Sequence, residues 1–98
     1  MLYVAIGRDI GGTPMPGEQW LELQDEVIQA VGGRPDTIAH GRSFWRSDSE
    51  DTCVFVWFGI DELRELGEAR LRDLAGDYGQ DAIAWVAGAT QFAEPWKK

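Results

Sequence analysis

The spacing of hydrophobic positions changes several times along the chain and predicts six elements of secondary structure. Short apolar runs and alternating runs predict strands, whereas apolar residues three and four positions apart predict helices. In chain order we expect a strand over Leu2–Arg8, a helix over Glu18–Val31, strands over Asp36–Arg46 and Thr52–Phe58, a helix capped by Asp61 whose end is marked by Gly76 and Gly79, and a strand over Asp81–Phe92.

Two of these runs carry the most information. Thr52–Phe58 is apolar at nearly every position, which is typical of a strand covered on both faces. Asp36–Arg46 alternates instead, and one of its sides carries Ile38, His40, Arg42 and Phe44. The polar residues 47–51 predict a turn that joins the two strands as a hairpin.

The order of the elements predicts an α+β fold of ferredoxin-like type, βαββαβ, formed by residues 1–98 as a single domain. Its four-stranded antiparallel sheet has the order 4-1-3-2, and both helices cover one face. The uncovered face would expose a large apolar surface, for which the candidate interface residues are Tyr3, Phe55, Trp57 and Trp85. We therefore predict a homodimer, or a partner protein docked on the sheet.

Charge limits the classes of partner. Acidic residues outnumber basic residues by 17 to 9, and the formal net charge is −8. Phosphate backbones would be repelled by most of the surface, so nucleic-acid binding is not expected. The apolar runs are too short to span a membrane and no basic leader precedes the first strand, so we expect no membrane contact and a cytoplasmic location.

Residues that could carry chemistry are few. His40 is the single histidine and no orienting partner for it is evident, while Cys53 lies in an apolar run and is expected to be buried. One histidine and one cysteine do not make a usual zinc site, so neither a metal nor another cofactor is expected. Gly11-Gly12-Thr13 lacks the lysine of a phosphate-binding loop. The chain is therefore predicted to bind rather than to catalyse.

The predicted topology gathers polar residues at one end of the sheet. The candidate polar site consists of Arg8 and Asp9 where the first strand ends, Gln80 and Asp81 where the last strand begins, and Trp20 at the start of the first helix. In one interpretation Arg8 binds an anion, Gln80 adds a hydrogen bond and Trp20 forms a wall. In the other, Arg8 pairs with Asp81 or Asp9, and Trp20 packs the helix onto the sheet.

The same residues carry a resemblance. They are Gly7-Arg8, Trp20, Phe44-Trp45-Arg46 and Tyr78-Gly79-Gln80-Asp81-Ala82-Ile83. On these positions the chain resembles small proteins of unknown function encoded by actinobacterial phages, and it is similar to a bacterial domain family of unknown function. The resemblance implies a phage protein that acts in the host cytoplasm by binding a host protein.

Three functional hypotheses follow. The first is a non-enzymatic, phage-encoded interaction protein that is dimeric through its sheet and binds a host protein. The alternative is a small-molecule-binding or enzymatic protein resembling dimeric α+β barrels, in which Arg8, His40 and Gln80 orient a ligand. The third is mimicry of nucleic acid, which predicts salt-sensitive binding to a basic DNA-binding protein.

Overall fold

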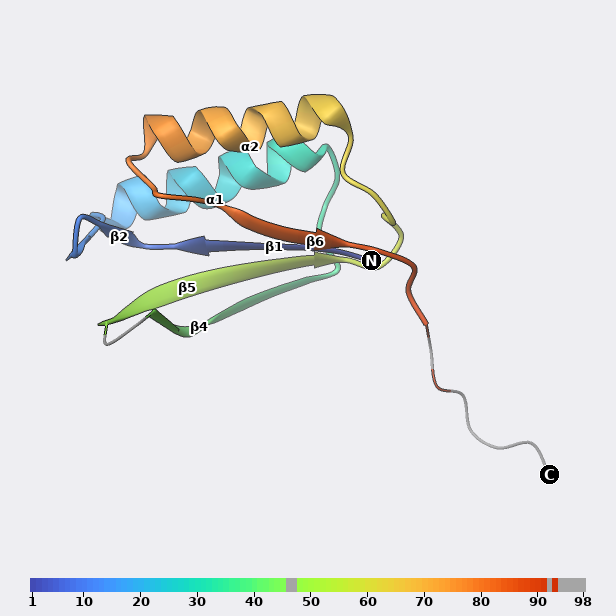
Figure 1. Cartoon of the computed structure of the whole chain (residues 1–98), viewed down its shortest axis with the longest axis horizontal. Coiled ribbons are helices and arrows are strands. Elements are labelled where there is room, and N and C mark those ends of the chain that lie inside the picture. Colours follow the sequence, from blue (N-terminus) through green and yellow to red (C-terminus); the bar gives the residue numbers. More distant parts are fainter. Residues whose placement is uncertain (46–47, 92, 94–98) are drawn as a thin grey trace.

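The chain folds into two helices that pack on one face of a four-stranded antiparallel sheet (Figure 1). The computed structural model describes residues 1–45, 48–91 and 93. Its elements, in chain order, are β1 (Leu2–Gly7), β2 (Asp9–Ile10), β3 (Thr13–Pro14), α1 (Gly17–Val31), β4 (Thr37–Trp45), β5 (Asp48–Trp57), α2 (Glu65–Asp77) and β6 (Ala84–Ala87). The predicted α+β class with two helices is confirmed.

The strands of the sheet lie in the order β4-β5-β1-β6, and each neighbouring pair is antiparallel. Tyr3 of β1 lies opposite Val56 of β5 on one side and opposite Val86 of β6 on the other. The central strands are therefore β1 and β5. The short strands β2 and β3 pair with each other in a segment that we expected to be a loop. The element order thus contains two strands beyond the expected βαββαβ.

The hydrophobic core lies between the helices and the sheet. On β1 the buried residues Leu2, Val4 and Ile6 alternate with half-buried residues, so one face of the strand points toward the helices. The remaining buried apolar residues come from the segment before α1, from β5 and from the helices: Met15, Trp20, Leu23, Val27, Cys53, Phe55, Trp57, Leu71, Leu74 and Tyr78.

The first helix matches its prediction. Helix α1 buries Trp20, Leu23, Gln24 and Val27, which are spaced three and four residues apart. It ends at Gly32, whose φ of 88° is a left-handed conformation that residues with a side chain rarely adopt. The Gly32 N–H donates to the Ile28 carbonyl over 3.0 Å. The end of α1 therefore has a direct backbone cause at Gly32.

The second helix begins later than predicted. Helix α2 starts at Glu65, and its N-cap is Arg64, which has extended backbone angles and no side-chain capping bond. Asp61 does not cap it, because its carboxylate accepts a hydrogen bond from the N-terminal amine of Met1 at 3.0 Å. The N-cap prediction for Asp61 is therefore wrong: a partner distant in sequence takes up the side chain that local capping would have used.

Two strand boundaries also differ from prediction. Strand β5 starts at Asp48, so residues 48–51, expected in a turn, continue the ladder with β4. Polar cross-strand contacts sustain this part, including the hydroxyl pair of Ser43 and Thr52 at 2.5 Å. Strand β6 is limited to Ala84–Ala87, shorter than the predicted Asp81–Phe92, and Phe92 lies outside the described residues.

Three of the four candidate interface residues lie on the helix-covered side of the sheet. Phe55 and Trp57 are in the core, with ring centroids 6.1 Å apart, and the Trp57 indole N–H donates to the Gly33 carbonyl at 2.8 Å. Trp85 is paired with the buried Val4, so it also faces the helices. The expectation that these rings lie on the uncovered face is wrong, because a strand that is apolar throughout gives no signal of which side faces the helices. Tyr3 does lie on the uncovered face.

Candidate functional site

Arg8 and Trp20 meet in a cleft at the end of β1. The cleft has a volume of about 400 Å³, and we call it the Arg8 cleft; its lining residues are Arg8, Trp20, His40, Gly41, Arg42, Asp51 and Thr52. Trp20 comes from the first turns of α1 and is buried, so it both packs the helix onto the sheet and forms a wall. For Trp20, the two predicted roles coincide.

Arg8 is positioned by three contacts. Its Nε donates to the Met15 carbonyl at 2.8 Å, and its Nη1 lies 3.8 Å from a carboxylate oxygen of Asp51. Its backbone N–H donates to the Asp51 carbonyl at 2.9 Å, which prolongs the pairing of β1 with β5. The partner of Arg8 is therefore Asp51, and neither Asp81 nor Asp9 as we had expected.

Positive charge gathers in this cleft although the chain is acidic overall. Asp51 also lies 3.6 Å from the Nε of Arg42, so one carboxylate stands between two guanidinium groups. His40 lines the same cleft and is exposed. Two fixed positive charges against one carboxylate leave a net positive charge, and guanidinium groups are suited to carboxylates and phosphates. The Arg8 cleft can therefore accept a small anion.

Gln80 and Asp9 meet elsewhere, by the open end of β1. The Gln80 Nε2 donates to the Asp9 carbonyl at 3.0 Å, while the Asp9 N–H donates to Oε2 of Glu50 at 2.9 Å. These residues and Asp81 border a separate cavity of about 350 Å³. The hydrogen bonds tie β2 to the segment after α2 and to β5. The geometry is that of a structural clasp between three chain segments.

Close packing at this clasp explains why residue 7 is a glycine. A β-carbon added to Gly7 would collide with the carboxylate of Glu50, the same carboxylate that accepts the hydrogen bond from Asp9. The glycine lets this side chain lie flat across the strand end. Gly7 belongs to the clasp, because it leaves room for the Glu50 carboxylate. Arg8 belongs to the Arg8 cleft, because it pairs with Asp51.

The structure divides the candidate polar site into these two clusters. Arg8 and Trp20 lie in the Arg8 cleft, and Asp9, Gln80 and Asp81 lie at the clasp. The predicted candidate site did not include Arg42, Glu50 or Asp51. Arg42 belongs to the alternating pattern that we recognised, and the hairpin register places it opposite Asp51. The two acidic residues were missed because a polar strand end resembles a turn.

The other face of the sheet is covered by no element among the described residues (Figure 1). We call it the open face. Strand pairing assigns these residues to it: Tyr3, Ala5, Gly7, Thr37, Ala39, Gly41, Ser43, Glu50, Thr52, Val54, Val56, Ala84 and Val86. Its centre is made of small and branched side chains, and of the residues that define it only Glu50 is charged.

The cysteine thiol and the possible metal-binding side chains are not placed for chemistry among the described residues. Cys53 is buried, and this desolvation raises the pKa of its thiol to about 11, so the thiolate is not formed at neutral pH. Within the part of the chain that the structure describes, no group of three or more His, Cys, Asp or Glu side chains is placed to hold a metal ion. None of the described helices is long and apolar enough to cross a membrane.

Comparison with family models, with curated proteins and with solved structures finds no match for the chain. Function must therefore be argued from the geometry of its surfaces. The resemblance to phage proteins stays a prediction of the sequence.

Proposed function

We propose that this chain is a small, non-enzymatic interaction protein that forms a homodimer through the open face of its sheet. The observation that carries the proposal is the open face itself. Two uncharged rows cross all four strands there; they are Val86, Tyr3, Val56 and Thr37, and Ala84, Ala5, Val54 and Ala39. Val54 and Val56 are only half-buried although they lie on a central strand.

The size and chemistry of this face support a second copy as its partner. Four strands about 4.8 Å apart and about 20 Å long make a face of roughly 300–400 Å². Apolar patches of this size on monomers are often functional. A two-fold interface brings the same surface together twice, so it needs a surface that matches itself. The two uncharged rows of the open face, made of Tyr3 and of small and branched side chains, meet that condition without paired charges.

Light scattering coupled to size-exclusion chromatography tests the proposal. We expect a mass of twice 10.9 kDa for the natural chain and a monomer for Val54→Lys, which puts a charge at the centre of the open face. Leu66→Lys is the matched control, because Leu66 is an exposed apolar residue of α2, on the opposite side of the sheet. A natural chain that stays monomeric at every concentration contradicts the proposal.

A host protein as the further partner, a source in an actinobacterial phage and a site of action in the host cytoplasm remain predictions of the sequence. The net charge of −8 supports a partner with a basic surface. Attraction between opposite charges speeds association, and repulsion between like charges disfavours acidic partners. Mimicry of nucleic acid rests on the same charge.

We also propose that the fold is ferredoxin-like. The support is the strand order of the sheet when the short strands β2 and β3 are left out of the count. Numbered in chain order, β1, β4, β5 and β6 are then strands 1 to 4, and they lie side by side in the order 2-3-1-4. Read from the other edge, this order is 4-1-3-2.

The Arg8 cleft favours a second candidate function, the binding of a small carboxylate or phosphate. Of the residues expected to orient a ligand, Arg8 and His40 line this cleft, whereas Gln80 lies at the clasp. Because Trp20 forms a wall, a bound ligand is expected to change its fluorescence. Titration with citrate and inorganic phosphate tests this candidate, with Trp20→Phe as the control that loses the signal. An unchanged emission spectrum with both anions would remove it.

A further inference from the structure

The outer edge of β6 presents backbone groups that pair with no other strand among the described residues. Met1 and Gly88 exchange two backbone hydrogen bonds, the first from the N-terminal amine and the second from the Gly88 N–H, and this sets the phase of the β1–β6 ladder. Bonding positions alternate along an antiparallel pair. Ala84 and Val86 therefore bond toward β1, and the N–H and C=O groups of Trp85 and Ala87 point away from the sheet.

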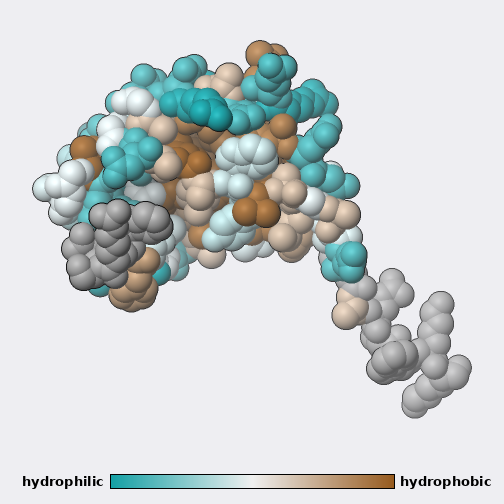
Figure 2. All heavy atoms as spheres, viewed as in Figure 1, coloured by the Kyte–Doolittle hydropathy of each residue, from teal (hydrophilic) through white to brown (hydrophobic). Residues whose placement is uncertain are grey.

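This edge, Ala84–Ala87, is short, but it lacks two other features that usually prevent strand addition, namely charged side chains and proline. Trp85 is 38% exposed and Val86 is 66% exposed. Figure 1 looks onto this edge, and no other described helix or strand lies in front of β6. In the same view, apolar residues form a band below the hydrophilic surface of α2 (Figure 2).

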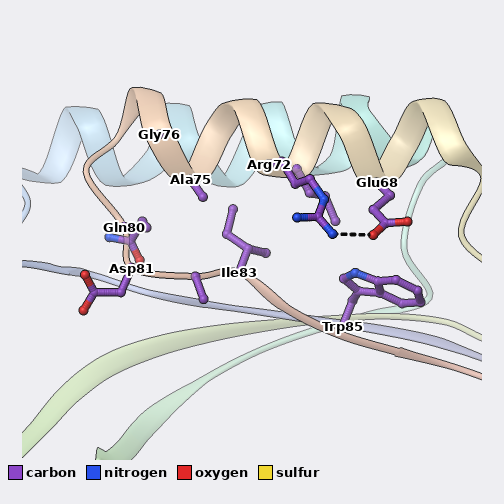
Figure 3. A pocket seen from close by; sticks show the side chains of 10 residues that line it. Glu68, Arg72, Ala75, Gly76, Gln80, Asp81, Ile83 and Trp85 are labelled. Carbon is purple, nitrogen blue, oxygen red and sulfur yellow. Dashed lines mark hydrogen bonds and ion pairs between the residues drawn. The ribbon is translucent and has the colours of Figure 1, made fainter.

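A cleft of about 420 Å³ lies between α2 and residues 80–85, and Trp85 is the residue of β6 that lines it. Figure 3 shows Ile83 and Trp85 pointing from the strand side toward the helix. Leu71 of α2 is among its lining residues and is buried. In a strand added to β6, every second side chain would point to the helix-covered side, where this cleft lies. The cleft therefore offers a pocket for one large apolar side chain.

The charges around the cleft favour a basic partner. Arg72 is bound to Glu68 at 2.9 Å, and Asp81 lies at the far end of the cleft. The lining thus carries one more negative than positive charge, within a chain of net charge −8. A second copy of this chain is disfavoured here, because a four-residue edge buries too little apolar surface to offset the repulsion between two acidic chains.

We propose that the edge of β6 binds an extended segment of another protein by strand addition. The segment places one large apolar side chain in the cleft beside Trp85 and has basic residues on either side of it. This inference rests on the proposed function, since it names the kind of partner that an interaction protein of this shape would take.

The experiment measures peptide binding by calorimetry. The probe is an acetylated and amidated peptide, Lys-Arg-Thr-Val-Leu-Val-Thr-Arg-Lys, whose central leucine is meant for the cleft. In an antiparallel addition, N-methylation of this leucine removes a hydrogen bond to β6, whereas N-methylation of the next valine leaves the ladder intact. We expect about ten-fold weaker binding for the leucine derivative and little change for the valine derivative.

A protein variant tests the same contact from the other side. Ala87→Pro removes an outward N–H while leaving the bonds of Ala84 and Val86 to β1, and Ala87→Ser retains that N–H. We expect about ten-fold weaker peptide binding for the proline variant only. Thermal melting of both variants verifies that they fold, and the two N-methylated peptides test the contact without any change to the protein.

The remaining outcomes separate this inference from the proposed function. Equal binding of both N-methylated peptides would mean that charge alone holds the probe, and would overturn the inference. Absence of binding by a chain that still dimerises, and is made monomeric by Val54→Lys, would overturn the inference and leave the proposed function standing. A dimer that is disrupted by Ala87→Pro instead would assign the edge to a second copy, and would also overturn it.

Discussion

Gln24 offers the sharpest test of how the core is built. It lies on α1 and faces β5, with only 8% of its surface exposed. Its Oε1 accepts a weak hydrogen bond from the Sγ of Cys53 at 3.7 Å. Its Nε2 has no hydrogen-bond partner among the described residues. A polar donor has therefore been removed from water without full compensation.

Replacing this residue with methionine should stabilise the protein. A buried and unsatisfied amide group costs about 1–3 kcal/mol, and methionine has a similar length, a similar helix propensity and no polar hydrogen. The substitution also removes the weak bond from Cys53, which offsets about 0.5 kcal/mol of the gain. We expect Gln24→Met to raise the free energy of unfolding by about 0.5–2.5 kcal/mol. For a domain of this size, each kcal/mol raises Tm by about 4–8 °C.

Urea and thermal unfolding monitored by circular dichroism measure the change. Gln29→Met on the same helix is the matched control, because Gln29 is exposed and its replacement should change stability by less than about 0.5 kcal/mol. The denaturant slope should be the same in all three proteins if the comparison concerns one folded state. Should Gln24→Met match the control or lower the stability, the Nε2 is paired in the folded protein and the reasoning fails.

Three further predictions follow from the core and the clasp. The thiol pKa of Cys53 is near 9 when the chain is unfolded and about 11 when it is folded, so this thiol should lower stability by up to about 1.4 kcal/mol per pH unit between pH 9 and 11. Burial also raises the pKa of Tyr78 to about 12. Cys53→Ala should therefore flatten the profile between pH 9 and 10 in urea titrations. Phe55→Ala should lower the free energy of unfolding, measured with a chemical denaturant, by about 3–5 kcal/mol. Phe44→Ala should change it little, because Phe44 is 78% exposed. Equal losses would contradict the placement of these two rings. Gly7→Ala and Glu50→Ala should each lower the free energy of unfolding by about 1 kcal/mol, because either one breaks the hydrogen bond from the Asp9 N–H to Glu50. The double variant should lose less than the sum of the two. Full additivity would mean that the two sites are not coupled.

Local patterns predicted what depends on neighbours along the chain. The spacing of Trp20, Leu23 and Val27 determines a helix with one buried stripe, and Gly32 ends it through its own backbone angles. The alternation of β4 likewise predicted which residues share a face, and the register with β5 agrees with it. These features follow from the periods of helix and strand, which any short stretch of sequence reveals.

Only the tertiary structure decided which side of each strand meets the helices. Phe55 and Trp57 were placed on the wrong side because a run that is apolar in both directions has no visible phase. The candidate site was divided for a related reason: the consecutive residues Gly7 and Arg8 point to opposite faces, so one meets Glu50 and the other Asp51. Those partners lie more than forty positions away, at a register set by the β1–β5 ladder. Local sequence determines the elements and their faces, whereas the partners of each face depend on how distant segments pair.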